Sequence, residues 1–502
     1  MRILLVKPRP TAVQFGLAPF FQTEPLGLEY IATALQARGH VVQVVDMRFE
    51  RRRVAAILGA FRPETVGIAC LHILDVPATL DLAGQIKARD KAIFVAVGGH
   101  AASAYPTALD HAAAVDAICI GEGENVMTTL CDAIEKRASL EDVPSLLLPN
   151  GNGGFRPSSV KEGWLDLPQV KPPDRSTIVR YQKHYCCLNY MPVWTLETAR
   201  GCPHRCKFCS VWQFYRRSYR CHAPAHVRQD FEATGQHVFI IDDLFWADKE
   251  QSQDLARALL SSPERKRWIL VQSRPDLVSE NPDLLELWRP LAKNFDIFFG
   301  FESPTAAGLD SLNKESDISK TIAAIRLARK LGFGVTGNFI IDPDFSEDDF
   351  AALWQFLDEH QLYRVGFTIL TPLPGTYYFE QSAARLKILD WNQYDLHHLL
   401  WTPRLPVKRF FELYSQTWQR TVLNTAGRKK WWRWLKDVDP RHLLRLARIL
   451  IRTKRLMDPK AYLAETKIRD SEPEPQAGES AHGAETQTLA VKPQSEAVEE
   501  TD

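Results

Sequence analysis

The sequence predicts an α/β protein in which a doubly wound, Rossmann-like sheet precedes a partial (β/α)6 barrel and a helical C-terminal region. Three observations support this prediction. Short β-branched runs alternate with helical patterns over residues 1–137, six further strand–helix units follow over 191–400, and several strands end at glycine. Apolar strands separated by helical segments are typical of parallel sheets that are covered on both faces.

The first region is expected to contain five parallel strands. They are Ile3–Val6, Val41–Val45, Thr65–Ala69, Ile93–Val97 and Ala117–Ile120. One helical pattern lies between the first two strands, at Gly27–Arg38, and stops at Gly39. Another follows the fifth strand, at Glu124–Arg137. Because such sheets bind ligands outside the carboxyl ends of their strands, we expect a binding site at that edge.

The second region is expected to form the barrel. Its strands are expected at Trp194–Glu197, Val238–Ile241, Trp268–Gln272, Asp296–Phe299, Val335–Ile341 and Arg364–Leu370. Residues 138–190 are rich in Pro, Gly and Asp, so we expect a surface linker there. Residues 401–466 have a mostly helical pattern, and the polar residues 467–502 are expected to be disordered.

Composition is ordinary for a globular protein, with 45% hydrophobic and 25% charged residues. No apolar run reaches the roughly 18 residues that a membrane span needs, and the N-terminal run is too short for a signal peptide. The nine cysteines are an odd number, and three of them crowd into residues 202–209. This usage differs from a secreted disulfide framework, so we expect a reducing, cytoplasmic location and a metal site.

Charge is distributed unevenly along the chain. Residues 471–502 hold eight acidic residues and one lysine, a net charge of −7, which leaves +8 on the rest of the chain. The chain is therefore expected to combine a mildly basic folded part with an acidic tail.

The clustered cysteines have the spacing C-x3-C-x2-C in the run Arg200-Gly-Cys202-Pro-His-Arg-Cys206-Lys-Phe-Cys209. The run directly follows a predicted strand, which places it on a loop at that strand's carboxyl end. Three thiolates can hold three irons of a [4Fe–4S] cluster and leave the fourth iron open. The alternative is a structural zinc site with Cys221 as fourth ligand. We favour the cluster, because zinc sites usually pair two CxxC-like units and no second unit follows.

These residues resemble the signature of the radical S-adenosylmethionine (SAM) superfamily, which also has an aromatic residue where Phe208 stands. The resemblance spans about residues 191–400. It implies that Cys202, Cys206 and Cys209 bind the cluster and that SAM chelates the open iron. It further implies cofactor contacts at strand ends or on strands, namely at Glu302, Arg274, Asn338 and Asp242. For each of these four, a capping or turn role is the alternative.

The first region resembles the cobalamin-binding domain of the B12-dependent radical SAM family. The resemblance rests on Pro25-Leu26-Gly27-Leu28, Gly98-Gly99-His100 and Gly121-Glu122-Gly123-Glu124. It implies that Gly98, Gly99 and Gly121 approach cobalamin, with His72 as a further candidate near the ring. No D-x-H-x-x-G motif is present, so cobalt could lack a histidine ligand from the protein. The alternatives are a surface role for His72 and a ligand-free Rossmann-like module.

Residues 428–456 contain eleven Lys or Arg residues and three tryptophans, with leucines on one helical face. A basic amphipathic helix of this kind suits an anionic membrane surface, which would place the protein at the inner face of the membrane. The alternative is a helix that packs on the barrel with a solvated basic face. No nucleic-acid partner is expected, because no recognition motif is present.

Two segments, Cys209–Tyr215 and Asn338–Phe345, resemble the hopanoid C-3 methylases in particular. This resemblance implies a cobalamin-dependent radical SAM C-methyltransferase that acts on an unactivated carbon of a lipid or isoprenoid. Its cofactors would be the [4Fe–4S] cluster, SAM and methylcobalamin, with an external electron donor such as flavodoxin or ferredoxin. The alternatives are a radical SAM/B12 enzyme that acts on a tetrapyrrole or closes a ring, and a non-enzymatic metal-binding scaffold.

Overall fold

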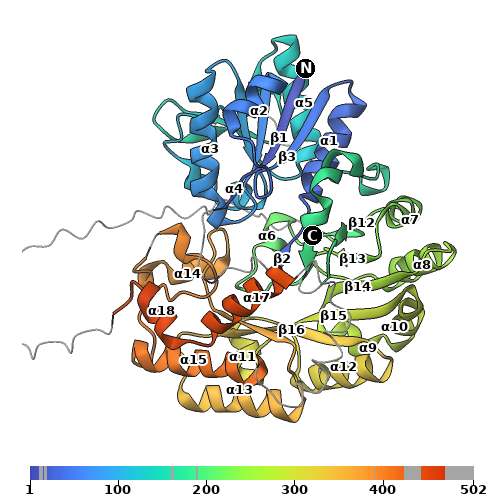
Figure 1. Cartoon of the computed structure of the whole chain (residues 1–502), viewed down its shortest axis with the longest axis vertical. Helices are drawn as coiled ribbons and strands as arrows, with labels where there is room; N and C mark the ends of the chain where they lie inside the picture. The colour runs from blue at the N-terminus through green and yellow to red at the C-terminus, as the bar shows by residue number, and fades with distance from the viewer. Residues whose placement is uncertain are drawn as a thin grey trace, which may run out of the picture.

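The computed structural model describes residues 1–10, 15, 20–159, 163–187, 190–388, 390–422 and 443–469. A mainly parallel sheet and a parallel sheet form two layered domains, and Figure 1 shows the first domain above the barrel with the C-terminal helices against the barrel. The predicted fold class is thereby confirmed.

The first sheet contains all five predicted strands. They are β1 (Arg2–Lys7), β3 (Val41–Asp46), β4 (Thr65–Ala69), β5 (Phe94–Gly98) and β6 (Ala117–Cys119). Their order is β3-β1-β4-β5-β6, and every pairing among them is parallel. The chain order therefore reverses between β1 and β4, and the ends of these strands define the edge at which such sheets bind ligands.

Helices cover both faces of this sheet because successive residues of its strands point to opposite sides. Ile3 and Leu5 pack with α1 (Leu26–Ala37) and α5 (Gly123–Lys136). Leu4 and Val6 pack on the other face, which is covered by two further helices, α2 (Val54–Phe61) and α3 (Val76–Arg89). Strand β1 is thus buried on both faces, as its uninterrupted apolar sequence indicates.

The segment 138–190 is not the surface linker that its composition suggests. Strands β7 (Leu146–Pro149) and β8 (Phe155–Pro157) extend the first sheet in antiparallel pairing beyond β6. A 3₁₀ helix, η5 (Arg175–His184), packs on α1, and Tyr185 is buried and donates to Asp46 Oδ2 at 3.2 Å. Short strands such as Leu146–Pro149 bury only alternate residues, so the surrounding Pro and Gly residues mask them in the sequence.

The second sheet has six parallel strands in sequential order. They are β10 (Trp194–Leu196), β13 (His237–Ile240), β14 (Lys266–Ser273), β15 (Ala292–Glu302), β16 (Gly334–Ile341) and β17 (Val365–Ile369). The intervening helices include α7 (Pro224–Ala233), α8 (Lys249–Leu260), α9 (Pro275–Glu280), α10 (Pro282–Trp288), α11 (Ala306–Ser311), α12 (Ile318–Lys330) and α13 (Glu347–Glu359). Strands β10 and β17 do not pair with each other, so the sheet is an open, partial barrel.

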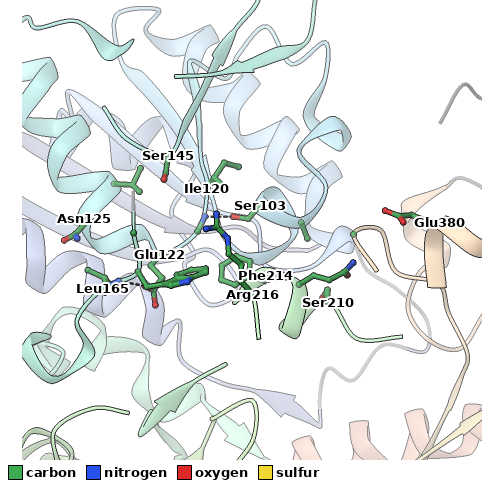
Figure 2. A pocket seen from close by; sticks show the side chains of 17 residues that line it. Ser103, Ile120, Glu122, Asn125, Ser145, Leu165, Ser210, Phe214, Arg216 and Glu380 are labelled. Carbon is green, nitrogen blue, oxygen red and sulfur yellow. Dashed lines mark hydrogen bonds between the residues drawn. The ribbon is translucent and has the colours of Figure 1, made fainter. Parts of the chain in front are cut away.

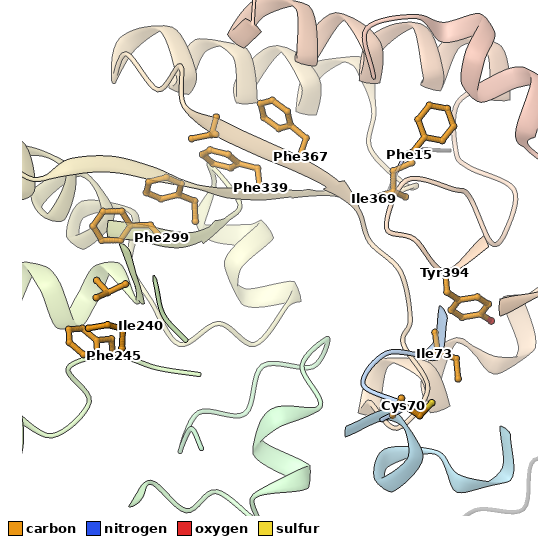
Figure 3. Close-up of a cluster of buried hydrophobic side chains, with 14 of the residues drawn as sticks. Phe15, Cys70, Ile73, Ile240, Phe245, Phe299, Phe339, Phe367, Ile369 and Tyr394 are labelled. Carbon is orange, nitrogen blue, oxygen red and sulfur yellow. The ribbon is translucent and has the colours of Figure 1, made fainter. Parts of the chain in front are cut away.

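Aromatic side chains fill the space between the barrel sheet and its helices. Phe299, Phe339 and Phe367 are fully buried on neighbouring strands, as Figure 3 shows. The apolar core continues into the first domain through Phe15, which stacks on Tyr462 of α18 (Pro459–Glu465) with ring centroids 4.2 Å apart. Each buried side chain of this size contributes about 1.5–3 kcal/mol, so a shared core ties the two domains together.

The C-terminal region is helical where it is described. It contains α15 (Val407–Val422), α17 (Leu443–Leu456) and α18, preceded by α14 (Tyr377–Ser382). Residues 423–442 and 470–502 lie outside the described residues, and with them most of the predicted disordered tail and the first half of the basic segment 428–456. Among the helices that are described, none combines the length and the apolar character that a membrane span requires.

Candidate cofactor site

The three clustered cysteines lie on one loop at the carboxyl end of the first barrel strands, as predicted. The loop follows β11 (Ala199–Arg200) and ends at α6 (Val211–Phe214). Backbone bonds fix its course, because Lys207 N–H donates to Leu312 O at 3.1 Å and Tyr378 N–H donates to Lys207 O at 3.0 Å. The Trp212 indole N–H donates to Cys206 O at 3.0 Å. The loop is therefore preformed by the protein.

The backbone conformation directly before the first cysteine, Cys202, requires glycine at position 201. Its φ of +96° lies in the left-handed region, and a Cβ there would collide with the carbonyl oxygen of Ser218. Its N–H donates to Asp243 Oδ2 at 3.0 Å, and burial raises the pKa of Asp243 to about 6. Asp243 therefore orients the start of the cluster loop.

Three free cysteines on one loop provide the set of sulfur donors that a [4Fe–4S] cluster with one open iron requires. Burial raises the pKa of all three thiols, that of Cys209 to about 12, so a thiol keeps its proton unless a cation replaces it. A bound metal ion supplies that charge and deprotonates the thiol. Within the described residues, no set of three or more His, Cys, Asp and Glu side chains is close enough to hold a single metal ion. Cys221, the candidate fourth zinc ligand, lies on β12 (Arg220–Cys221) beside Asp242 and Asp248.

Glu302 lies at the carboxyl end of β15, as the resemblance implies, and it has a partner that the sequence did not reveal. Lys314 Nζ donates to Glu302 Oε1 at 2.9 Å, and both side chains are buried. Burial opposes the Lys314 ammonium, but Glu302 and Cys206 outweigh it and raise the pKa of Lys314. Glu302 has a φ of +59° at a β-bulge, a strained backbone typical of functional positions.

Arg274 lies beside the cluster loop, with Nη1 3.9 Å from Cys206 Sγ. Its Nε and Nη2 donate to Asp276, and Nη2 also donates to the carbonyls of Lys314 and Glu315 at 2.7 and 2.9 Å. Arg274 thus anchors the turn that carries Lys314. Its contact with the SAM carboxylate stays a prediction.

Asp242 and Asn338 form contacts within the protein. Asp242 accepts from Thr198 N–H at 2.7 Å and from the Thr198 hydroxyl, so it holds the backbone before the cluster loop. Burial raises the pKa of Asp242 to about 8. Asn338 lies in the middle of β16 and donates to Thr368 Oγ1 at 2.8 Å. Thr198 thus engages both Asp242 oxygens once, and since a carboxylate can accept further hydrogen bonds, the implied cofactor contacts of Asp242 and Asn338 stay predictions.

A cavity of about 490 Å³ lies between the first sheet and the cluster loop, as Figure 2 shows. Gly121 and Glu122 line it from the end of β6, and Ser210, Phe214 and Arg216 line it from the residues after Cys209. Gly121 has a φ of +85°, and a Cβ there would meet open space. The cavity adjoins the carboxyl edge of the sheet, where the resemblance implies cobalamin, and it offers an open cradle there.

Gly98, Gly99 and His72 lie at the same sheet edge, but they do not line this cavity. Gly99 has a φ of +115°, and a Cβ there would lie 2.7 Å from the carbonyl oxygen of Cys70, so glycine allows the ends of β4 and β5 to approach. His72 Nδ1 accepts from Leu74 N–H at 3.2 Å. A neutral ring must then carry its proton on Nε2, which leaves no lone pair there for cobalt. The cobalamin contacts of these three residues stay predictions.

Comparison with known families and proteins agrees with this geometry. The family model of the B12 binding domain matches residues 17–131, and that of the radical SAM superfamily matches residues 196–357. The hopanoid C-3 methylase of Methylococcus capsulatus is 30% identical over 415 residues, which cover 82% of this chain and 78% of that protein. The bacteriochlorophyllide d C-8(2)-methyltransferase of Chlorobaculum tepidum is 25% identical and covers 79% of this chain and 86% of that protein.

Solved structures show the same fold. The cobalamin-dependent SAM radical enzyme OxsB, with aqua-cobalamin and SAM bound, superposes with a TM-score of 0.69 at 16% identity, over 92% of this chain and 74% of that one. The chain therefore belongs to the radical SAM enzymes that carry an N-terminal B12-binding domain, whose cofactors are a [4Fe–4S] cluster, SAM and cobalamin.

Proposed function

We propose that this radical SAM enzyme transfers a methyl group to an unactivated carbon of an isoprenoid-type lipid, with C-3 of a hopanoid as the first candidate. One observation supports this most strongly. The loop of three cysteines lies between the buried Glu302–Lys314 pair at the barrel end and a cavity at the edge of the first sheet. The relative with 30% identity is a hopanoid C-3 methylase, whereas the matching tetrapyrrole enzymes are 24–27% identical.

The protein's own residues would hold the cluster, SAM and cobalamin. When bound, the cluster supplies the electron that cleaves SAM reductively, and cobalamin supplies the methyl group. Cys202, Cys206 and Cys209 would hold the cluster, and Glu302, fixed by Lys314, would orient SAM. Gly121 would let the corrin ring system approach the backbone.

An apolar cluster beside the loop suits an apolar substrate. Leu312, Ile340 and Leu370 are buried together, with Phe208 and Tyr378 packed against them. Phe208 stands between two of the cluster cysteines in the chain, so this apolar wall adjoins the cluster. Apolar packing at this position would exclude water from the reactive groups beside it.

The exposed face of α17 would bring the enzyme to its lipid substrate. Leu450 and Ile451 are 54% and 61% exposed, and Arg448, Lys454 and Arg455 on the same helix are exposed as well. Apolar side chains among basic ones favour peripheral contact with an anionic membrane, at its cytoplasmic face. The electron would come from an external donor such as flavodoxin or ferredoxin.

The test is anaerobic reconstitution with iron, sulfide and cobalamin, followed by reduction in the presence of SAM and a desmethyl hopanoid. We expect 5′-deoxyadenosine and a hopanoid that is one methyl group heavier, both detected by mass spectrometry. A parallel reaction contains a chlorophyllide. Methylation of the chlorophyllide alone would overturn the lipid assignment, and absence of 5′-deoxyadenosine with every substrate would overturn the proposed chemistry.

A further inference from the structure

The first domain contacts the cluster loop on both sides of the three cysteines. Arg200 stands two residues before Cys202, and Ser210 directly follows Cys209. Each of these residues bonds a side chain that comes from the carboxyl edge of the first sheet. The two partner segments are the glycine motifs that follow β5 and β6.

Arg200 is held by three carboxylates, two of them from the first domain. Its Nη1 donates to Glu122 Oε1 at 2.9 Å, its Nη2 to Glu124 Oε1 at 2.7 Å, and its Nε to Glu197 Oε1 at 2.8 Å. Arg200 is only 6% exposed, so water does not compete for these bonds. All three nitrogens of the guanidinium group are hydrogen-bonded, which fixes its orientation. A lysine ammonium group, which is a point charge, could not be fixed in this way.

A second arginine and a histidine also contact this group of carboxylates. Arg220 donates to both oxygens of Glu122 at 2.9 and 3.1 Å, and His222 Nε2 lies 2.9 Å from Glu197 Oε1. Burial alone would raise the pKa of Glu197, but Arg200 and His222 outweigh it and lower that pKa to about 2. Glu197 is therefore ionised within the network, and both oxygens of Glu122 have arginine partners.

His100 provides the second contact, on the other side of the cysteines. Its Nε2 lies 2.6 Å from Ser210 Oγ, and its ring packs against Phe214 with centroids 4.8 Å apart. His100 begins the short helix α4 (His100–Ala104), directly after Gly99. The sequence suggested only that the glycines of these motifs serve a ligand, whereas the polar residues beside them bond the cluster loop.

The same side chains also form the wall of the cavity. Glu122 lines it and bonds Arg200, and Ser210 and Phe214 line it and contact His100. Figure 2 shows Glu122, Phe214 and Ser210 around this space. A molecule in the cavity and a cluster on the loop would therefore restrain one shared set of residues.

We propose that Arg200, Glu122, Glu124 and His100 are positioning residues that couple the two cofactor sites, so that cluster loading tightens cobalamin binding and cobalamin binding steadies the cluster loop. The proposal rests on the proposed function in one respect, that the cavity receives cobalamin. Coupling of this kind is reciprocal and typically changes affinity by about 5- to 150-fold. If the network were merely structural, substitutions in it would change stability but would leave the ratio of cobalamin affinities with and without the cluster unaltered.

The test measures the Kd of aquacobalamin by visible absorption, for the full chain with and without a reconstituted cluster under anaerobic conditions. For the unaltered protein we expect a Kd about fivefold lower, or more, when the cluster is present. In Glu124→Gln and Arg200→Lys we expect this ratio to fall toward one, with a changed EPR spectrum of the reduced cluster. The matched control is Asp283→Asn, which removes an exposed ion pair to Lys249 on the barrel surface and should keep the full ratio.

Ser210→Ala removes a single hydroxyl and serves as the second variant if the charge variants fail to fold. A reduced ratio in Ser210→Ala supports the coupling. An equal Kd with and without the cluster in the unaltered protein, or an unchanged ratio in the variants that fold, overturns it. Complete absence of cobalamin binding to the cluster-loaded protein would instead contradict the proposed function, so the two failures are distinguishable.

Discussion

Two buried arginines connect the first domain to the barrel, and they differ in how their charge is matched. Arg175, in η5, donates to Asp230 at 2.7 and 2.9 Å and to Glu24 at 2.6 Å. Glu29 lies 3.9 Å from the same guanidinium, and neither of its oxygens has a hydrogen bond. At Arg200, by contrast, a second arginine, Arg220, bonds one of the three carboxylates.

This difference separates two roles. The Arg175 group contains more carboxylates than cations, and burial is the largest of the effects that raise the pKa of Glu24, Glu29 and Asp230. Arg175 also donates to Thr195 O on β10, and none of its hydrogen bonds goes to the cluster loop. The Arg200 group has two arginines for its three carboxylates, and it adjoins Cys202. We therefore infer that Arg175 holds the domains together, whereas Arg200 positions the cofactor loop.

The largest expected effect follows from removal of Arg175. Arg175→Met leaves three carboxyl groups buried without their cation, and breaking a buried ion pair in this way costs about 3–5 kcal/mol of stability. Thermal unfolding followed by circular dichroism should show a clear decrease in Tm. The ratio of cobalamin affinities with and without the cluster should remain, since the Arg200 group is intact. A Tm equal to that of the unaltered protein would refute the structural role.

An intermediate effect is expected at Lys314. Lys314→Met leaves Glu302 buried without its charged donor, at a cost of about 1–3 kcal/mol. Because Glu302 then loses its fixed orientation, the affinity for SAM should fall, as measured by equilibrium dialysis on the cluster-loaded protein. Lys320→Met removes an exposed pair with Glu280 and should change neither quantity. Unaltered SAM affinity in Lys314→Met would show that Lys314 does not orient Glu302 toward SAM.

A smaller, pH-dependent effect is expected at Glu29. Burial, followed by the charge of Glu24, raises the pKa of Glu29 well above its ordinary value of 4.5. The folded protein therefore favours the neutral form of Glu29. The free energy of unfolding that the neutral form contributes is fully present at low pH and is lost as pH rises through the raised pKa. Glu29→Gln removes this loss, so its Tm relative to the unaltered protein should increase from pH 5 to pH 8.

The stabilisation by Glu29→Gln should be largest at pH 8, because the amide cannot ionise whereas the buried carboxyl group with its raised pKa can. Calorimetry across this pH range checks the prediction. A Tm difference that is constant with pH would show that Glu29 is ionised at neither end or at both ends of the range.

The smallest effect is expected at the second contact between the domains. Ser210→Ala removes one hydrogen bond to His100, worth about 0.5–1.5 kcal/mol. The Tm should change little, while the EPR linewidth of the reduced cluster should increase because the loop after Cys209 is less restrained. A loss of Tm as large as that of Arg175→Met would contradict the distinction between the two regions.

Local patterns in the sequence did not predict the antiparallel strands β7 and β8, but they were sufficient to predict the parallel strands of both sheets and the loop of three cysteines. Each depends on residues that are close together in the chain, such as the apolar run Ile3–Val6 or the spacing of Cys202 and Cys209. The position of Glu302 followed in the same way from the end of a strand.

Features that depend on distant partners could not be predicted. Glu122 and Glu124 bond an arginine that follows them by 78 and 76 residues, and no local pattern signals such a pair. Lys314 reaches Glu302 only because of the bulge at Gly300 and the turn that Arg274 holds. The bonds from Thr198 to both oxygens of Asp242 were likewise not evident from the sequence, because 44 residues separate the two.

The central claim is that the three cysteines leave one iron of a cluster open for SAM beside Glu302. The most direct measurement is the EPR spectrum of the anaerobically reconstituted, reduced protein before and after addition of SAM. The account predicts a cluster signal that changes when SAM is added and that is absent from a variant in which Cys202, Cys206 and Cys209 are replaced by alanine. A colourless protein that binds zinc, or a cluster signal that SAM leaves unchanged, would contradict it.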